Sequence, residues 1–173
     1  KPMRIGVYAL DPTFSATVTD GKGWITVIYS GKELGNGVYS VMSEDWGNTW
    51  SDPQLIFFAS SDVLWPSEIK LLLGNDRDVH AVWALADLSG NSRAVYYARF
   101  DVATSQWAKP TLLAKSINSV VDTPNIIEYD DSLIVIYHDG VPLTRYMLRS
   151  LDGGNTWSAS PRLFEQIGSN GAA

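Results

Sequence analysis

The chain of 173 residues is long enough to form one domain with a real core, and its 45% hydrophobic and 18% charged residues argue against a disordered protein. The net charge of -6 and the absence of a basic stripe argue against nucleic acid as a partner. Because there is no cysteine, disulfides and thiolate zinc sites are excluded, and no apolar run is long enough to predict a membrane-spanning segment.

The order of predicted elements repeats three times along the chain, over residues 9–58, 62–114 and 120–164. Each unit opens with a proline and an alternating strand, and then has a polar turn and a very apolar strand that ends in an aromatic residue. A third strand carries a tyrosine, a turn follows that ends at a tryptophan, and a short fourth strand closes the unit. The aligned positions are Pro12, Tyr29, Tyr39 and Trp50 in the first unit, Pro66, Trp83, Tyr97 and Trp107 in the second, and Pro124, Tyr137, Tyr146 and Trp157 in the third.

Four short strands with tight turns in about fifty residues are typical of a β-propeller blade. We therefore predict an all-β fold with three four-stranded antiparallel blades, in which residues 1–173 form a single propeller segment and residues 165–173 a tail. Because the sequence starts without Met, we expect a mature product or a segment of a longer polypeptide.

An eight-residue stretch, SEDWGNTW at residues 43–50, returns as SLDGGNTW at residues 150–157. It could mark a catalytic site used twice or a structural turn, and its residue types favour the turn. The Asp can accept hydrogen bonds from backbone N–H groups, the Gly can take a positive φ, the Thr can tie the outgoing strand and the Trp can enter the apolar layer. The turn residues are Ser43, Asp45, Gly47, Thr49 and Trp50 in the first copy and Ser150, Asp152, Gly154, Thr156 and Trp157 in the second.

Both copies resemble the Asp-box, or BNR repeat, of the sialidase-like β-propeller superfamily. Its members are most often six-bladed and include sialidases, other glycoside hydrolases and non-catalytic binding proteins. The resemblance implies that the chain forms about half of a six-bladed ring and that each Asp-box lies between the third and fourth strands of its blade, away from a substrate pocket. The middle unit departs from the motif, since FDVATSQW stands there with only Trp107 retained.

Resemblance to sialidases also implies a catalytic set of three substrate-binding arginines, an acidic residue and a Tyr–Glu pair. The first arginine is expected two residues before an opening proline, but Leu10, Leu64 and Asp122 occupy those positions. Only Arg4, followed by Ile and Gly, and Asp11 are weak catalytic candidates, and the other arginines are expected to form salt bridges on blade edges.

Residues at the start of an innermost strand line the central channel of a propeller, so Asp11, Glu68 and Asn125 are candidate binding residues. The alternative is that they form hydrogen bonds with a neighbouring blade. His80 and His138 lack the spacing of a metal pair, so we expect no metal and no cofactor.

Three blades cannot close a ring, so we expect the open faces to be covered by a second copy, another chain or a missing segment. The function that we predict is a non-catalytic Asp-box module for binding or scaffolding, with carbohydrate as a candidate ligand. The alternative is a fragment of a sialidase or another exo-acting glycoside hydrolase. An extracellular, periplasmic or cell-surface location is expected.

Overall fold

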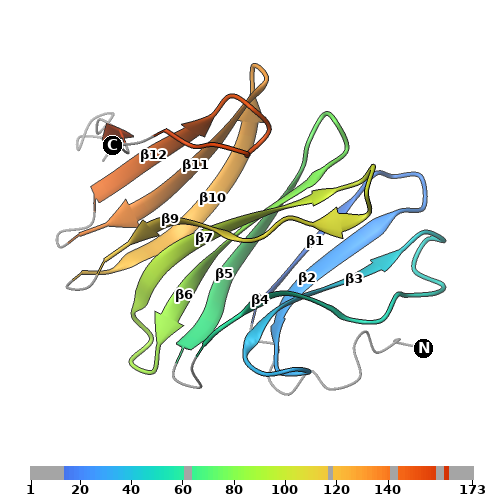
Figure 1. Ribbon diagram of the computed structural model, residues 1–173, viewed down its shortest axis with the longest axis horizontal. Coiled ribbons are helices and arrows are strands. Elements are labelled where there is room, and N and C mark those ends of the chain that lie inside the picture. The colour runs from blue at the N-terminus through green and yellow to red at the C-terminus, as the bar shows by residue number, and fades with distance from the viewer. Residues whose placement is uncertain (1–13, 61–63, 117–118, 141–143, 159–161, 164–173) are drawn as a thin grey trace, which may run out of the picture.

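The computed structural model describes residues 14–60, 64–116, 119–140, 144–158 and 162–163. Three antiparallel sheets follow one another along the chain and lie side by side as successive blades (Figure 1). The first blade has the strand order β1 (Ser15–Thr19), β2 (Ile25–Gly31), β3 (Gly37–Ser43) and β4 (Gln54–Phe58). The prediction of an all-β fold built from three antiparallel blades is therefore confirmed.

The second blade has the order β5 (Leu64–Leu73), β6 (Val79–Asp87), β7 (Ser92–Asp101) and β8 (Gln106–Trp107), and β9 (Thr111–Lys115) also pairs with β7. Its outer strand is thus split into two pieces, and Pro110, which has no N–H to donate to β7, lies between them. The third blade has the order β10 (Val121–Tyr129), β11 (Ser132–Asp139), β12 (Thr144–Ser150) and β13 (Arg162–Leu163).

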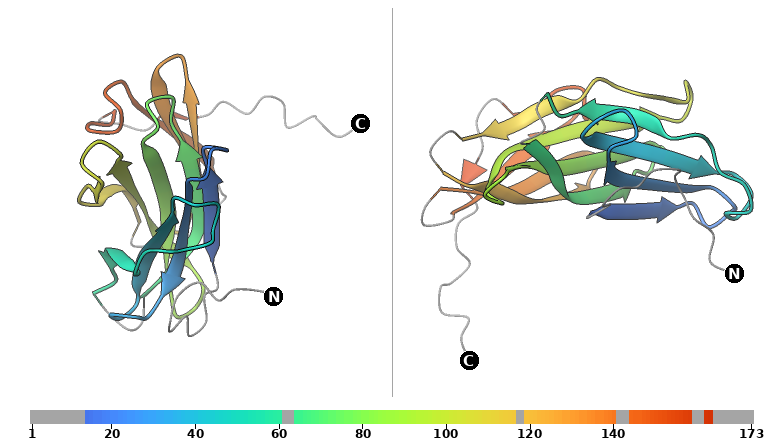
Figure 2. Two further views of the ribbon diagram at one scale, coloured as in Figure 1. Left: turned by 90° about the vertical axis from the view of Figure 1, so that its right-hand side faces the viewer. Right: turned by 90° about the horizontal axis from the view of Figure 1, so that it is seen from below.

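The innermost strands β1, β5 and β10 gather along one side of the molecule, while β4 and β9 lie along the opposite side (Figure 2). This arrangement brings residues that are far apart in the sequence onto one surface at the inner edge of the blades. No helix long and apolar enough to cross a membrane occurs in the described part of the chain.

Apolar side chains fill the two spaces between neighbouring blades. Ile28, Val38, Ala81 and Trp83 belong to the cluster between the first and second blades. Val82, Val95, Val135 and Leu148 belong to the cluster between the second and third. Because successive residues of a strand point to opposite faces, each blade supplies one set of side chains to each neighbour.

In the second and third blades, a tryptophan that follows the third strand contacts the preceding blade. Trp107 donates a hydrogen bond from Nε1 to Ser40 Oγ of the first blade at 3.0 Å. The Trp157 ring meets the Tyr97 ring of the second blade edge to face, with the ring centroids 4.9 Å apart. These two tryptophans therefore also hold neighbouring blades together.

A cross-strand pair of aromatic rings stacks in every blade, and in the second and third blades it lies on the side facing the preceding blade. The pairs and their centroid distances are Tyr29–Tyr39 at 5.9 Å, Trp83–Tyr96 at 6.0 Å and Tyr137–Tyr146 at 5.9 Å. The predicted alignment was wrong by one residue in the middle unit, because Trp83 pairs with Tyr96. Tyr97 points to the opposite face and packs toward the third blade.

The opening prolines of the second and third units are not equivalent either. Glu68, two residues after Pro66, and Thr123, directly before Pro124, both adopt positive φ angles, of 51° and 47°. The ladder is irregular at both places. The common feature of β5 and β10 is therefore this bulge rather than the proline, and no proline spacing in the sequence could have located it.

Candidate functional site

The first Asp-box turn lies between β3 and β4 and satisfies its polar groups within itself. Asp45 Oδ1 accepts hydrogen bonds from the Thr49 N–H at 2.8 Å and from Ser43 Oγ at 2.9 Å, and Oδ2 accepts one from Thr49 Oγ1 at 2.7 Å. The Gly47 N–H, at a φ of 83°, donates to Ser43 Oγ at 2.8 Å. Bonds from the Thr49 N–H and hydroxyl hold the pKa of Asp45 below its ordinary value.

The second turn, between β12 and β13, repeats this geometry closely. Asp152 Oδ1 accepts from the Thr156 N–H at 2.8 Å and from Ser150 Oγ at 2.8 Å, and Oδ2 accepts from Thr156 Oγ1 at 2.6 Å. These bonds, with the Thr156 hydroxyl foremost, lower the pKa of Asp152 to about 2. The carboxylate oxygens of both turns are thus occupied by the turns themselves, so the geometry favours a structural role.

The middle turn uses a different carboxylate from the one that the motif would supply. Asp101, at the end of β7, accepts a hydrogen bond from the Thr104 N–H at 2.9 Å, and this bond is the first cause of its lowered pKa. The predicted alignment placed Val102 at the Asp position, so the carboxylate lies one residue earlier than expected.

Glu68 lies at the inner edge of the blades and lines two cavities. One, of about 360 Å³, lies between the first and second blades and is also lined by Phe14, Lys32, Trp65 and Asp87. Glu68 sits at the strained bulge of β5, which turns its side chain toward β10, and its Oε2 accepts a hydrogen bond from the Thr123 N–H at 2.7 Å.

The second cavity, of about 440 Å³, lies where the three inner strands meet and is lined by Glu68, Lys70, Thr123 and Asn125 among others. The structure thus brings two of the predicted binding residues, Glu68 and Asn125, onto one surface. Asn125 Oδ1 accepts a hydrogen bond from the Ile126 N–H at 2.9 Å. Arg4 and Asp11 lie outside the described residues.

Trp65 gives the first cavity a flat apolar wall. The Lys32 ammonium lies 4.3 Å from the centroid of the Trp65 ring, within the range of a cation–π interaction. Asp87, from the end of β6, is paired with Arg93 at 3.0 Å. The cavity therefore combines one aromatic surface, the Lys32 cation that lies over it and the Glu68 carboxylate, a mixture suited to a ligand with both apolar faces and hydroxyl groups. The Asp87 carboxylate at its edge also accepts hydrogen bonds from the N–H groups of its own turn.

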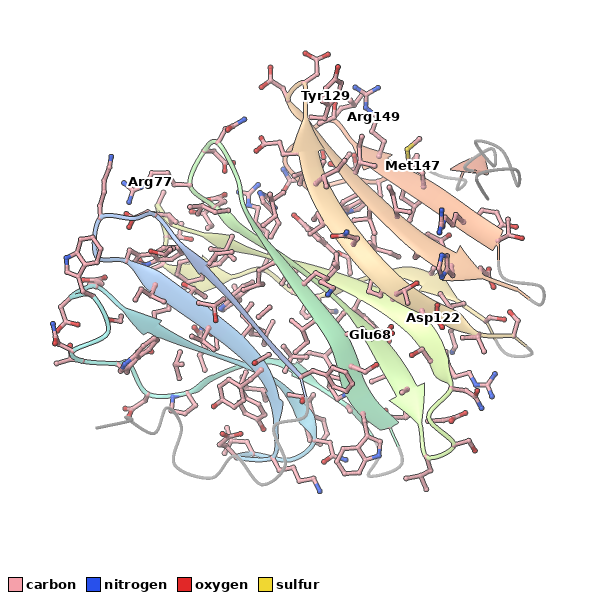
Figure 3. The ribbon with its side chains drawn as sticks, turned by 180° about the vertical axis from the view of Figure 1, so that it is seen from behind. Glu68, Arg77, Asp122, Tyr129, Met147 and Arg149 are labelled. Carbon is pink, nitrogen blue, oxygen red and sulfur yellow. The ribbon has the colours of Figure 1, made fainter. Side chains whose placement is uncertain are left out.

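A chain of polar contacts beside Glu68 was not predicted as a site. Arg145 Nε donates to His138 Nε2 at 3.1 Å, so the ring proton must be on Nδ1, which lies 2.7 Å from Thr123 Oγ1. Thr123 Oγ1 in turn donates to Asp122 Oδ1 at 3.2 Å. Figure 3 shows Glu68 and Asp122 on the adjoining strands β5 and β10. The position of Asp122, two residues before Pro124, was the available signal.

The described arginines do not converge. Arg77 pairs with Asp20 at 3.0 Å, Arg99 with Asp78 at 2.9 Å, and Arg93 with Asp87, each in a different part of the fold. Arg145 contacts His138 and Arg149 contacts Ser132. Arg93 is part of β7.

One Tyr–Glu hydrogen bond occurs among the described residues, but its environment opposes nucleophilic chemistry. The Tyr29 hydroxyl donates to Glu33 Oε1 at 2.8 Å, and Tyr29 is almost completely buried. Burial, and next the Glu33 carboxylate, raise the pKa of Tyr29 well above its ordinary value, which keeps the phenol protonated. Neither residue lines the cavities around Glu68.

The histidines also have partners within the protein. His80 is buried, its Nδ1 lies 2.8 Å from the Tyr97 hydroxyl, and burial lowers its pKa. No cluster of three or more His, Asp or Glu side chains able to hold a metal ion is present in the segments that the structure describes.

No family model and no curated protein matches the chain. Among solved structures it is similar to an ulvan lyase of a polysaccharide lyase family, with a TM-score of 0.60 and 12% identity over 83% of this chain and 42% of that one. An α-L-arabinofuranosidase from Fusarium graminearum matches with a TM-score of 0.56 and 14% identity, over 90% of this chain and 49% of that one. A Hadza microbial sialidase matches with 0.55 and 16% identity, over 94% and 38%.

The chain spans less than half the length of each of these three structures. At such low identities the likeness shows the fold alone, and it agrees with the resemblance indicated by the two Asp-box turns. The chain therefore has the fold of part of a sialidase-like β-propeller, with three of its blades.

Proposed function

We propose that the chain is a non-catalytic recognition module that binds carbohydrate at the inner-strand surface around Trp65 and Glu68, as part of a ring that needs further blades. The observation that carries the proposal is the cavity of about 360 Å³ in which Trp65, Lys32, Glu68 and Asp87 come together. A tryptophan ring supports the apolar face of a sugar, and carboxylates accept hydrogen bonds from its hydroxyls.

The dispersed arginines support recognition rather than sialidase chemistry. A sialidase site needs guanidinium groups that grip one carboxylate together, whereas the described arginines are tied to separate partners. The three similar structures are named for activity on ulvan, for arabinofuranosidase activity and for sialidase activity. A carbohydrate ligand is the class that these names share. The proposal includes that the chain binds this carbohydrate outside the cytoplasm.

The test is a calorimetric titration of the chain with three probes, namely an arabino-oligosaccharide, an ulvan oligosaccharide and sialyllactose. We expect at least one to bind, with Trp65→Ala and Glu68→Gln each weakening that binding about tenfold or more. Trp46→Ala is the matched control, because Trp46 is 66% exposed and does not line the cavity. Binding that survives both cavity variants would refute the site.

A second candidate function is that of an exo-acting glycoside hydrolase fragment. It is favoured by Glu68 and Asp122, two carboxyl groups that contact the same residue, Thr123, beside His138 and Arg145. Glycosidases use a pair of carboxyl groups as acid and base or nucleophile. Turnover of aryl glycosides that is lost in both Glu68→Gln and Asp122→Asn would favour this function over pure recognition.

A further inference from the structure

The third blade has one face turned away from the rest of the molecule, which we call the outer face. Leu133, Val135, Tyr137 and Leu148 pack toward the second blade, so the residues between them on β11 and β12 point the other way. Figure 3 shows Met147 and Arg149 on this blade. The outer face consists of Ile127, Ile134, Ile136, His138, Arg145, Met147 and Arg149.

Strand register makes this face equivalent to the two faces that already receive a following blade. Directly paired residues on the second and third strands are Ile28 with Ser40 in the first blade, Val82 with Tyr97 in the second and Ile136 with Met147 in the third. Ser40 receives Trp107, and Tyr97 receives Trp157. Met147 is thus at the position where the tryptophan of a following blade would rest.

The next pair along the strands reinforces the equivalence. His80 pairs with Arg99, and Ile134 pairs with Arg149. Arg99 Nη1 donates to the Gly153 carbonyl, in the Asp-box of the following blade, at 3.2 Å. Arg149 therefore occupies the position at which Arg99 of the second blade contacts the Asp-box of the third, whereas the first blade has Met42 there.

Arg149 differs from Arg99 in its charge balance. Arg99 pairs with Asp78 at 2.9 Å, whereas Arg149 donates to the Ser132 hydroxyl at 2.6 Å. No carboxylate within salt-bridge distance of Arg149 occurs in the described segments of the chain. With Arg145 nearby, the outer face presents positive charge around an apolar centre of Ile136 and Met147.

The first blade carries the complementary features. Its Tyr29–Tyr39 stack has the same centroid distance of 5.9 Å and interplanar angle of 25° as the Tyr137–Tyr146 stack, which faces the second blade. Its Asp-box has Trp46 at the position of Gly153, and the adjoining Glu44 is exposed. Since Tyr39 is already fully buried in its own chain, contact would centre on the turn with Trp46 and Trp50.

We propose that the outer face of the third blade binds the first blade of a second copy, so that two chains close a ring of six blades. Two such contacts, related by a twofold axis, would close the ring. At each contact the Trp50 ring rests on Met147, and Arg149 donates to the Trp46 carbonyl and faces Glu44. This arrangement goes beyond the proposed sugar recognition, which uses other residues.

Sedimentation velocity over a concentration series tests the proposal. We expect a species of twice the 19.0 kDa of one chain. Met147→Glu and Arg149→Glu should each raise the dimer dissociation constant about tenfold or more, while the matched control Arg77→Glu, an exposed arginine in a turn, should leave it unchanged. Sugar binding should persist in all three variants, which separates this test from that of the binding site.

Cross-linking provides a second measurement that does not depend on how well the charge variants fold. Because the chain has no cysteine, Trp46→Cys with Arg149→Cys creates a single pair of thiols. A short bismaleimide should cross-link this double variant into covalent dimers. Neither single variant should be cross-linked, because position 46 of one chain faces position 149 of the other. A monomer at every concentration, or open oligomers that lengthen with concentration, would overturn the proposal.

Discussion

Replacing Gly154 by alanine probes how closely the third blade approaches the second. Gly154 adopts a φ of 89°, and a Cβ there would lie 2.8 Å from Tyr97 Cε1 and even closer to the Tyr97 hydroxyl. Gly47, the equivalent glycine of the first Asp-box, has a φ of 83°, but its nearest neighbour would be Trp50 Cζ2 at 3.4 Å. Both alanines suffer from the left-handed backbone, and only one meets another blade.

The two contributions can be given rough magnitudes. An alanine in the left-handed region costs about 1–2 kcal/mol, so Gly47→Ala should lower the free energy of unfolding by that amount. Overpacking against Tyr97 costs about 1–3 kcal/mol more, so Gly154→Ala should lose about 2–5 kcal/mol. Urea denaturation followed by tryptophan fluorescence measures both differences.

A double-mutant cycle identifies the Tyr97 hydroxyl as the cause. Tyr97→Phe alone removes the hydroxyl that bonds His80 Nδ1 at 2.8 Å and should cost about 1–3 kcal/mol. In the Tyr97→Phe background Gly154→Ala should cost less than in the natural chain, because the closest clash is gone. Equal losses for Gly47→Ala and Gly154→Ala, or no coupling with Tyr97→Phe, would refute the reasoning.

Two further predictions concern the turn and the tryptophan that join the blades. Asp152 has a pKa lowered from 3.8 to about 2, so its stabilising contribution is complete above 3.8 and is lost as the pH falls toward 2. Asp152→Asn should therefore flatten the decline of Tm over this pH range, and an unchanged acid profile would contradict the hydrogen bonds described for the turn. Trp107→Phe keeps an aromatic ring but removes the bond to Ser40 Oγ, so the free energy of unfolding should fall by about 1 kcal/mol, or by more if the smaller ring leaves a gap. A Ser40→Ala background should remove most of the hydrogen-bond part of that loss, and full additivity of the two changes would count against the bond.

Much of the fold could be predicted because its signals are local. Period-two alternation, turn residues and a repeated motif specify strands and blades without knowledge of distant contacts. The one-residue error at Tyr97 has a physical cause: adjacent Tyr96 and Tyr97 are both aromatic, and only pairing with Trp83 decides which of them faces the first blade. Sequence alone does not contain that pairing.

The candidate site was predictable only in part, for a related reason. Glu68 and Asn125 could be proposed because they follow prolines at the start of inner strands. Trp65 and Lys32 could not, because the cavity that joins them forms only when the first and second blades pack together. The partners of His138 could not be predicted either, because Thr123 and Arg145 come from the two strands on either side of it.

The most direct test of carbohydrate recognition at the inner strands is an NMR titration of the isotope-labelled chain with the oligosaccharide that binds best. The account predicts chemical-shift changes at Lys32, Trp65, Glu68 and Asn125, with the Asp-box residues 43–50 and 150–157 unaffected. Changes concentrated in the Asp-box turns, or no changes with any of the three probes, would contradict it.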